Sequence, residues 1–269
     1  MGTNGAATRP RIVYVGAERV GLACLRQLLK LRKHVVGVFT ADEALRPRIA
    51  DFVPFDAALA HSGVPLCSIT DSNSPAFVRR VKALKPDVLI AISWSQRIPD
   101  ALIDAVPRGC VGLHYALLPT RRGGAPLNWA ILDGLTRSGI TLFYMDRGLD
   151  TGDVIGQQRF AIGRHDTVKT LLDRVVRLAP RLLATHIDAI ERGDAPRIAQ
   201  DESLASSTAR RTPEQSRIDR AQSDDELYAF IRALAPPYPS AFTHVGRRKL
   251  VIPSAKFRGG KLWIEGYFV

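Results

Sequence analysis

Apolar and polar residues alternate along the first 115 residues in a pattern that predicts strands and helices in turn. Four continuous apolar runs are typical of strands buried on both faces of a sheet, at residues 11–16, 34–39, 87–92 and 110–113. Leucines three and four residues apart predict a helix over residues 20–31, and Ser74 followed by Pro75 predicts the start of another. Shorter helices are expected at residues 55–61 and after Pro99. This alternation predicts a parallel sheet with right-handed crossovers and helices on both faces.

Beyond residue 115 the pattern predicts fewer strands and a longer helix. The next elements are expected to be one helix and two strands, at residues 126–132, 139–145 and 154–162. Asp166 and Thr167 predict the start of a long amphipathic helix through residue 190. Pro180 falls inside that helix, where we expect a kink or a break.

The C-terminal part is expected to form a small lobe. Residues 194–218 are polar and loop-rich, and Ser223 with Glu226 matches a capping box, which predicts a helix through Leu234. Short β-like runs separated by Gly turns follow, at residues 241–244, 249–252 and 261–265. We therefore predict an α/β fold with a doubly wound, mostly parallel sheet and a small C-terminal α+β lobe.

The expected division has three parts. Residues 1–10 are small and polar and are interpreted as a disordered leader, residues 11–205 as the main domain and residues 206–269 as the lobe. The chain has 269 residues, 46% of them hydrophobic and 24% charged, which is typical of a globular protein with a sizeable core.

Composition also bears on location and partners. No apolar run approaches the roughly 20 residues that span a bilayer, and the N-terminus does not resemble a signal peptide. Cys24, Cys67 and Cys110 are widely spaced among apolar residues, which favours buried free thiols in a reducing compartment. We therefore expect a cytoplasmic protein without a membrane partner.

The formal net charge of +12 leaves phosphorylated ligands and nucleic acid open as partners. The charge is spread along the chain, about +7 over residues 1–206 and +5 over residues 207–269, and no basic tail occurs. A solvated surface accounts for most of it. Binding to nucleic acid is not the favoured interpretation; it would show as tRNA affinity that falls steeply with salt.

Candidate chemistry centres on a His and an Asp. His114 follows an apolar strand and precedes a loop rich in Pro and Gly, and Asp150 lies in a glycine-flanked turn. Ligands in parallel sheets bind at the carboxyl ends of strands, where His114 is expected. A carboxylate beside an imidazole can orient it as a proton shuttle. Either residue alone would also fit a structural role, so the pair carries the interpretation.

Other common sites are not supported. Gly16 to Gly21 lacks the first Gly of a dinucleotide fingerprint, and no acidic residue ends the second strand, which leaves only a turn that could approach a phosphate. His, Cys and acidic residues show no metal-ligand spacing, so no metal is expected.

Two long motifs make the interpretation specific. The first runs from His114 through Leu117-Leu118-Pro119 to Arg122-Gly123 and Ala125-Pro126, and the second is Gly148-Leu149-Asp150-Thr151-Gly152-Asp153. Together they resemble the folate-dependent formyltransferase family, whose members act on methionyl-tRNA or on nucleotide-linked amino sugars. The resemblance extends over roughly residues 11–252.

The resemblance implies a Rossmann-like fold and transfer of a formyl group from 10-formyltetrahydrofolate to a primary amine. In the family an Asn, a His and an Asp form the catalytic centre, and His114 and Asp150 match the last two. The resemblance also implies a set of donor-binding residues, namely Ser93, Trp94, Ser95, Arg97, Arg121, Gly123, Gly124, Ala125 and Pro126.

The sequence departs from the family at Gly112, where the catalytic Asn is expected. Loss of one oxyanion donor typically costs on the order of 100- to 1,000-fold in rate. Three explanations stay open. Water or a neighbour such as Ser93, Ser95 or Asn128 could substitute; the reaction could use another carbonyl donor or different chemistry; or the protein could bind ligands without catalysis.

The acceptor is expected to be a small amine, and a nucleotide-linked amino sugar is favoured over methionyl-tRNA. The reason is that the tRNA-formylating members of the family carry a further β-barrel domain, for which we expect the chain to leave no room. Apolar residues near the C-terminal edge, among them Trp263 and Phe268, could also pack against a second copy and form a homodimer.

Overall fold

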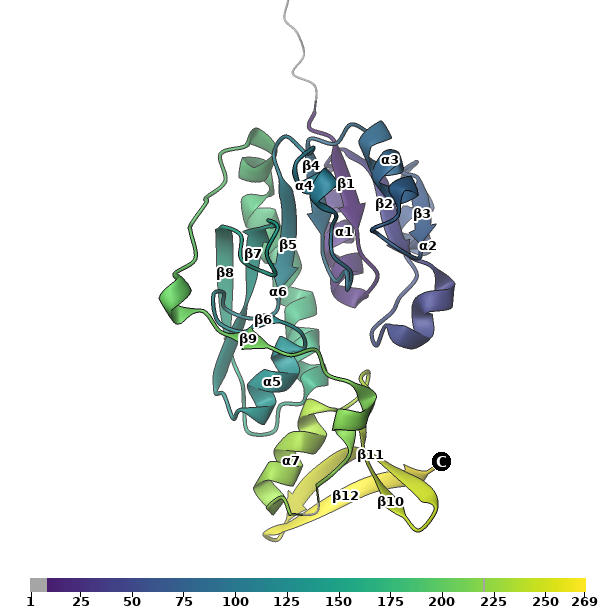
Figure 1. Cartoon of the computed structure of the whole chain (residues 1–269), viewed down its shortest axis with the longest axis vertical. Coiled ribbons are helices and arrows are strands. Elements are labelled where there is room, and N and C mark those ends of the chain that lie inside the picture. The colour runs from purple at the N-terminus through teal and green to yellow at the C-terminus, as the bar shows by residue number, and fades with distance from the viewer. Residues whose placement is uncertain (1–8, 220) are drawn as a thin grey trace, which may run out of the picture.

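A computed structural model describes residues 9–219 and 221–269, and its centre is a seven-stranded sheet. The strand order is β3-β2-β1-β4-β5-β7-β8. The strands are β1 (Ile12–Val15), β2 (Val35–Ala41), β3 (Leu66–Ile69), β4 (Val88–Ala91), β5 (Cys110–His114), β7 (Arg137–Tyr144) and β8 (Val154–Ala161). The first five are parallel, β7 runs antiparallel to β5, and β8 antiparallel to β7. The predicted mostly parallel sheet is confirmed (Figure 1).

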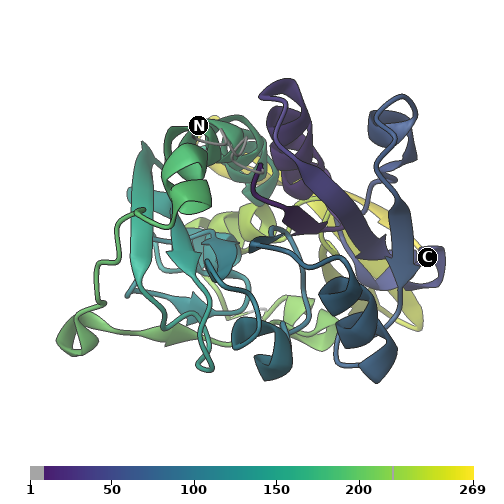
Figure 2. The ribbon, with the colours of Figure 1, turned by 90° about the horizontal axis from the view of Figure 1, so that it is seen from above.

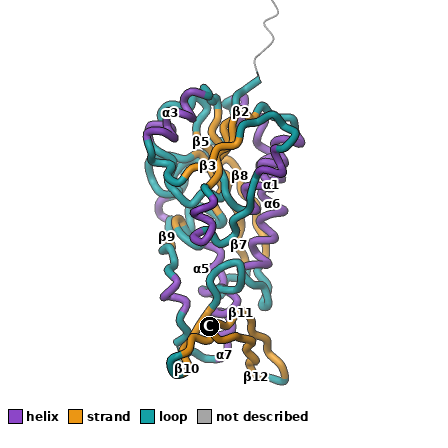
Figure 3. The backbone as a smooth tube through the Cα atoms, turned by 90° about the vertical axis from the view of Figure 1, so that its right-hand side faces the viewer, coloured by secondary structure: helices purple, strands orange, loops and turns teal. Residues whose placement is uncertain are grey.

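Helices cover both faces of the sheet, as Figures 2 and 3 show from two further directions. On one face lie α1 (Arg19–Lys30) and α6 (Val168–Arg192), and on the other α3 (Pro75–Ala83) and α4 (Asp100–Ile103). The short α2 (Asp56–Leu59) and α5 (Pro126–Leu132) complete this part. Strands β1 and β4 are buried along their whole length, because side chains from both layers of helices pack on them.

The helix starts follow the predicted capping residues. The Ser74 hydroxyl accepts a hydrogen bond from the Phe77 amide, and Thr167 and Ser223 form capping boxes. Pro180 neither breaks nor ends α6, contrary to one of the two outcomes expected for it. Buried side chains on both sides of it, Ala179 and Leu182 among them, hold the two halves of the helix against the sheet.

The small lobe packs α7 (Asp224–Ala233) on a three-stranded antiparallel sheet, below the main sheet in Figure 1. Its strands are β10 (Ala241–Val245), β11 (Arg248–Arg258) and β12 (Lys261–Phe268), longer than the short runs expected. The β11–β12 register shifts between Val251 and Ser254, at Pro253, which has no amide hydrogen to donate. Phe230, Ile231 and Ile252 belong to the lobe's own apolar cluster.

The segment between the two parts has little regular structure. It contains the 3-10 helices η2 (Glu202–Leu204) and η3 (Pro213–Ser216), and η1 (Glu43–Arg48) follows β2 in the main part. Strand β9 (Ser207–Thr208) of this segment pairs in parallel with β6 (Arg122–Gly123). The predicted leader, residues 1–10, falls almost entirely outside the described residues, and the predicted domain boundary at residue 205 stays a prediction.

Two local expectations change. Strand β3 was missed, because three of its four residues are only partly buried or exposed and it forms the sheet edge. Cys24 and Cys110 are buried free thiols, whereas Cys67 is half-buried, with its sulfur 2.8 Å from Arg80 Nη2. Within the described residues, no helix has the length and apolar character needed to cross a membrane.

The turn after β1 has a packing reason for its glycines. A Cβ on Gly16 would lie 2.7 Å from the Ile92 carbonyl oxygen, and one on Gly21 would lie 2.8 Å from the same atom. Both glycines therefore permit close backbone contact between the turn and the end of β4. This contact accounts for the two glycines at positions 16 and 21, which from the sequence alone were also compatible with a turn that could approach a phosphate.

Candidate active site

The candidate site lies at the carboxyl ends of the central strands. These ends face the small lobe (Figure 1). Strand β5 ends at His114, and side chains two residues apart on a strand share a face. Cys110 lies on that same face and packs in the cluster that contains Leu102 of α4. His114 therefore projects on the α3–α4 side of the sheet.

His114 is 7% exposed and has an acceptor near each ring nitrogen. Nε2 lies 2.7 Å from the Arg121 carbonyl oxygen, and Nδ1 lies 3.4 Å from Asp150 Oδ2. A neutral imidazole carries one N–H and can donate to only one of these acceptors, whereas the protonated ring can donate to both. The pair predicted from sequence is thus brought together, with a loop carbonyl as a third member.

Asp150 is held from two directions. Its backbone φ is 57°, and its Oδ2 accepts a hydrogen bond from the Gly123 amide at 2.8 Å. Asp146 builds the turn before it, because Asp146 Oδ1 accepts hydrogen bonds from the Gly148 amide and the Thr151 hydroxyl. The carboxylate that faces His114 therefore has a fixed orientation.

Gln200 positions this turn, and sequence reasoning missed it. Its Nε2 donates to the carbonyl oxygens of Asp150 and Gly152, at 2.9 and 2.7 Å. Its Oε1 accepts from the buried guanidinium of Arg122, which also pairs with Glu202. The hydrogen bond to Glu202 raises the pKa of Arg122. No local motif marks Gln200, and only the tertiary structure of the chain places it beside Asp150.

The loop expected to lie near the donor is fixed by the segment from the second half of the chain. Gly123 has φ of +98°, and a Cβ there would lie 2.6 Å from the Thr208 carbonyl oxygen. A Cβ on Gly124 would lie 2.5 Å from Arg210 Cα. The Arg121 guanidinium donates to Asp133 Oδ2 and so is already paired. Ala125 adopts φ of 51°, and α5 begins at the next residue, Pro126.

The loop over residues 93–97 lies beside the Asp150 turn. Arg97 Nη2 donates to Asp100 Oδ1 and to the Arg147 carbonyl oxygen, at 2.6 and 2.8 Å. Ser93 is hydrogen-bonded to the Tyr115 hydroxyl, and Ser95 is exposed. The Trp94 indole Nε1 is buried and has no hydrogen-bond partner in the described chain.

The side-chain space at Gly112 is filled by other residues. A Cβ there would lie 2.7 Å from Met145 Cε and 3.0 Å from Phe143 Cε1. Two of the three neighbours expected to substitute for an Asn at this position already have partners: Ser93 binds Tyr115, and Asn128 Nδ2 donates to the Ala233 carbonyl oxygen.

A second acidic group near the carboxyl edge was also missed. Glu18 follows β1 close to Asp51, and burial together with the Asp51 charge raises the pKa of Glu18 to about 7. Asp51 binds Arg19 through Oδ1, while its buried Oδ2 has no hydrogen-bond partner among the described residues. Burial and the charge of Glu18 also raise the pKa of Tyr238, from the small lobe. No group of His, Cys, Asp or Glu in the described part could hold a metal ion.

The fold and this His–Asp geometry define a transferase related to known formyl transferases. Residues 17–187 match the formyl transferase family, and residues 210–261 match the formyl transferase C-terminal domain. The chain is 33% identical over 236 residues to a methionyl-tRNA formyltransferase of Alkaliphilus oremlandii, which covers 87% of this chain and 76% of that protein. The chain belongs to the formyltransferase family.

Two solved structures share the fold at low identity. A sugar N-formyltransferase from Shewanella sp. superposes with a TM-score of 0.74 at 17% identity, covering 93% of this chain and 99% of that one. HypX from Aquifex aeolicus in complex with tetrahydrofolic acid gives 0.70 at 18% identity, covering 94% and 40%. The family's formyl donor is formyl-tetrahydrofolate, and the chain is a formyltransferase-like enzyme.

One argument about the acceptor is corrected by the second match. Residues 210–261 are similar to the formyl transferase C-terminal domain, so the chain contains at least part of a domain that was expected to be missing. The supposed lack of that domain therefore gives no support to a sugar acceptor over methionyl-tRNA.

We predict that Glu18 makes the protein less stable as pH rises. Its carboxyl is protonated in the folded state up to about pH 7 but ionises near 4.5 when unfolded, so the folded state binds more protons between these values. As pH rises from 4.5 to 7, the free energy of unfolding of the wild type should fall by at most about 3 kcal/mol relative to that of Glu18→Gln. Urea unfolding at pH 5 and pH 8 measures this, with exposed Glu43→Gln as control. Equal pH slopes in wild type and Glu18→Gln would contradict it.

Proposed function

We propose that the protein transfers a formyl group from 10-formyltetrahydrofolate to the primary amine of a small acceptor, with a nucleotide-linked amino sugar as the favoured class. The observation that carries the reaction is His114 at a strand end, between the Arg121 carbonyl and the Asp150 carboxylate. A sugar N-formyltransferase that shares the fold over nearly the whole chain motivates this acceptor class. A methionyl-tRNA formyltransferase from Clostridium thermocellum shares the fold over 97% of the chain, so the fold does not choose between the two acceptors.

Proton transfer is the role we assign to His114. The formyl carbon exchanges its bond to the donor nitrogen for a bond to the acceptor nitrogen, and the attacking amine gives up a proton. His114 takes that proton and returns it to the departing nitrogen, while Asp150 orients the ring and stabilises its charge. The Arg121 carbonyl occupies Nε2, so the loop must move before this nitrogen can contact a substrate.

Residues 93–97 and 121–126 are proposed to hold the folate donor. The unpaired indole N–H of Trp94 and the exposed hydroxyl of Ser95 supply polar groups beside the Asp150 turn. Arg97 and Arg121 already have carboxylate partners, so we propose that they hold the two loops in place. Their guanidinium groups could bind the donor only after those ion pairs break.

An activity assay tests the proposed reaction and the proposed acceptor together. Purified protein with the folate donor should formylate a member of a panel of nucleotide-linked amino sugars. His114→Ala and Asp150→Asn should lower the rate by roughly 100- to 10,000-fold, because they remove the proton shuttle or its orienting charge. His61→Ala, at an exposed position, serves as the control.

Methionyl-tRNA is the second candidate, because relatives 33% and 35% identical carry that activity in their names. It enters the same assay as a separate acceptor. Product with methionyl-tRNA alone would overturn the sugar class and leave formyl transfer standing. No product with any acceptor, together with no detectable folate binding, would overturn the whole proposal.

A further prediction concerns Gly112. We infer that the site works without the family's Asn, because Met145 fills the space that a side chain at position 112 would need. Gly112→Asn should therefore not raise the native rate, and displacement of Met145 and Phe143 should lower it. Gly112→Ala is the steric control, and thermal unfolding checks that both variants fold. A gain on the order of 100-fold in Gly112→Asn would show instead that an oxyanion donor is missing.

We also propose a homodimer that pairs through β12. This strand is the edge of its sheet, and Trp263, Ile264 and Tyr267 on it are exposed. Light scattering after size exclusion should give twice the chain mass of 29.5 kDa. Trp263→Glu should yield monomer, whereas Leu204→Glu, at an exposed apolar position elsewhere, should not. A wild-type monomer at micromolar concentration would refute the pairing.

A cytoplasmic location completes the proposal. Its support is the set of three unpaired cysteines, two of them buried, which suits a reducing compartment. Recovery of the protein outside the cytoplasmic fraction of cells would contradict it.

A further inference from the structure

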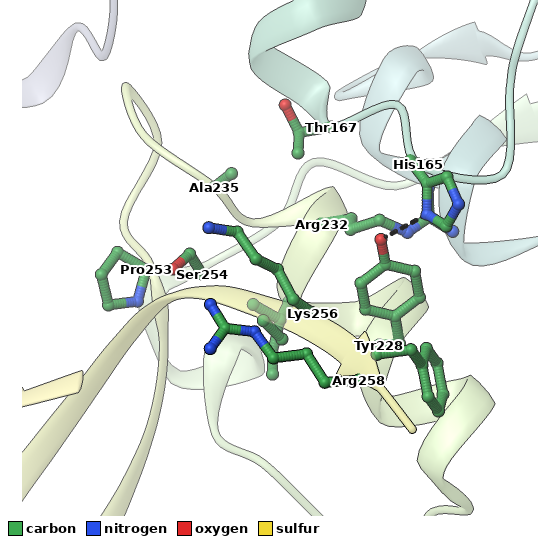
Figure 4. Close-up of a pocket in the computed structure, with 12 residues that line it drawn as sticks. His165, Thr167, Tyr228, Arg232, Ala235, Pro253, Ser254, Lys256 and Arg258 are labelled. Atoms are coloured by element: carbon green, nitrogen blue, oxygen red, sulfur yellow. Dashed lines mark hydrogen bonds between the residues drawn. The ribbon is translucent and has the colours of Figure 1, made fainter. Parts of the chain in front are cut away.

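A pocket of about 380 Å³ lies in the small lobe, between α7, β11 and the start of α6 (Figure 4). Its residues include His165, Tyr228, Arg232, Lys256, Phe257 and Arg258. α6 packs in the cluster on the sheet face opposite to the one on which His114 projects. The pocket is therefore separate from the candidate active site.

The charged side chains that line the pocket are basic. Arg232, Lys256 and Arg258 line it, and the described lining residues include no Asp or Glu. Lys256 and Arg258 lie two residues apart on β11, and Figure 4 shows their side chains next to each other. Arg258 makes no hydrogen bond or salt bridge with the described residues, although its charge acts on Glu265, which accepts a hydrogen bond from the lining Ser254 at 2.6 Å. Lys256 lies 3.9 Å from Glu265, in a solvent-exposed pair of the kind that contributes little.

Arg232 adds a buried donor without a partner. Its guanidinium lies 4.8 Å from the Tyr228 ring centroid, and its Nη1 donates to the Asp166 carbonyl oxygen. Its Nε is buried and has no hydrogen-bond partner within the described chain. Burial lowers the pKa of Arg232, so a nearby anion would stabilise the charged form of the side chain. The N-terminus of α6, at Thr167, also lines the pocket and favours negative charge.

The remaining walls are aromatic and apolar. The rings of Tyr228 and Phe257 meet edge to face, with centroids 5.2 Å apart, and the Tyr228 hydroxyl is hydrogen-bonded to His165 Nδ1. Ile231 and Pro253 add apolar surface. A volume of this size, with apolar walls and a few charged groups on one side, suits a small ligand that has a ring and an anionic end.

We propose that this pocket binds a small phosphate-bearing molecule with a ring, of the nucleoside phosphate class, whose phosphate contacts Lys256 and Arg258. The ring would lie against Tyr228 and Phe257. The proposal goes beyond formyl transfer and does not depend on it, since no residue of the pocket belongs to the His114 site.

Calorimetry with uridine monophosphate, uridine and inorganic phosphate tests the proposal. The monophosphate should bind saturably, and uridine should bind at least tenfold more weakly because it lacks the charge. The double variant Lys256→Gln/Arg258→Gln should weaken the monophosphate at least tenfold. The matched control is Arg247→Gln/Lys261→Gln, which removes two exposed charges of the same lobe outside the pocket. It should bind like the wild type, and so should His114→Ala.

Three outcomes would overturn the proposal. The wild type could fail to bind the monophosphate saturably. The control double variant could lose as much affinity as the pocket variant, which would indicate binding to a diffuse basic surface. A short RNA hairpin measured in parallel would then bind more weakly to both double variants. Unchanged binding in the Lys256→Gln/Arg258→Gln variant would place the ligand outside this pocket.

Discussion

The carboxylate of Asp150 is the point on which the arrangement of the site depends. It accepts a hydrogen bond from Gly123 and faces His114, while Gln200 holds the backbone of the same residue. Three segments far apart in sequence therefore meet at one turn: the end of β5 with the loop after it, the turn itself, and the segment of little regular structure that leads to the small lobe. Each hydrogen bond is modest on its own, but an unpaired group here would leave a desolvated charge or carbonyl.

Much of the fold could be predicted because its strands are buried on both faces. Continuous apolar runs such as residues 87–92 have few alternatives to a central parallel strand, and capping residues such as Ser223 mark helix starts locally. Strand β3 escaped because it forms the sheet edge and is only partly buried. The length of β11 escaped because Pro253 and Ser254 interrupt its apolar run, and only pairing with β12 fixes its end.

The site was predictable in position but not in contacts. The two motifs predict that His114 and Asp150 act as a pair, and the structure brings their side chains to 3.4 Å. The turn that carries Asp150 leaves the sheet at Tyr144, which pairs with Val111 near the start of β5, so only the folded loop brings Asp150 to His114. The long side chains of Arg97 and Arg121 point to partners that no local pattern specifies, Asp100 and Asp133. Gln200 has no motif at all, since its role comes from a backbone crossing that only tertiary structure creates.

The space beside Gly112 is filled by packing and not by a polar group. Met145 and Phe143 fill the space that a larger side chain would need, so the neighbourhood of His114 is apolar on that side. An apolar wall excludes water and strengthens the remaining electrostatic contacts of the imidazole. Under the proposed function Nε2 of His114 takes the proton of the attacking amine, which requires that the Arg121 carbonyl has moved away. Loop opening would therefore precede proton transfer, because Nε2 cannot bind the loop carbonyl and the substrate at the same time.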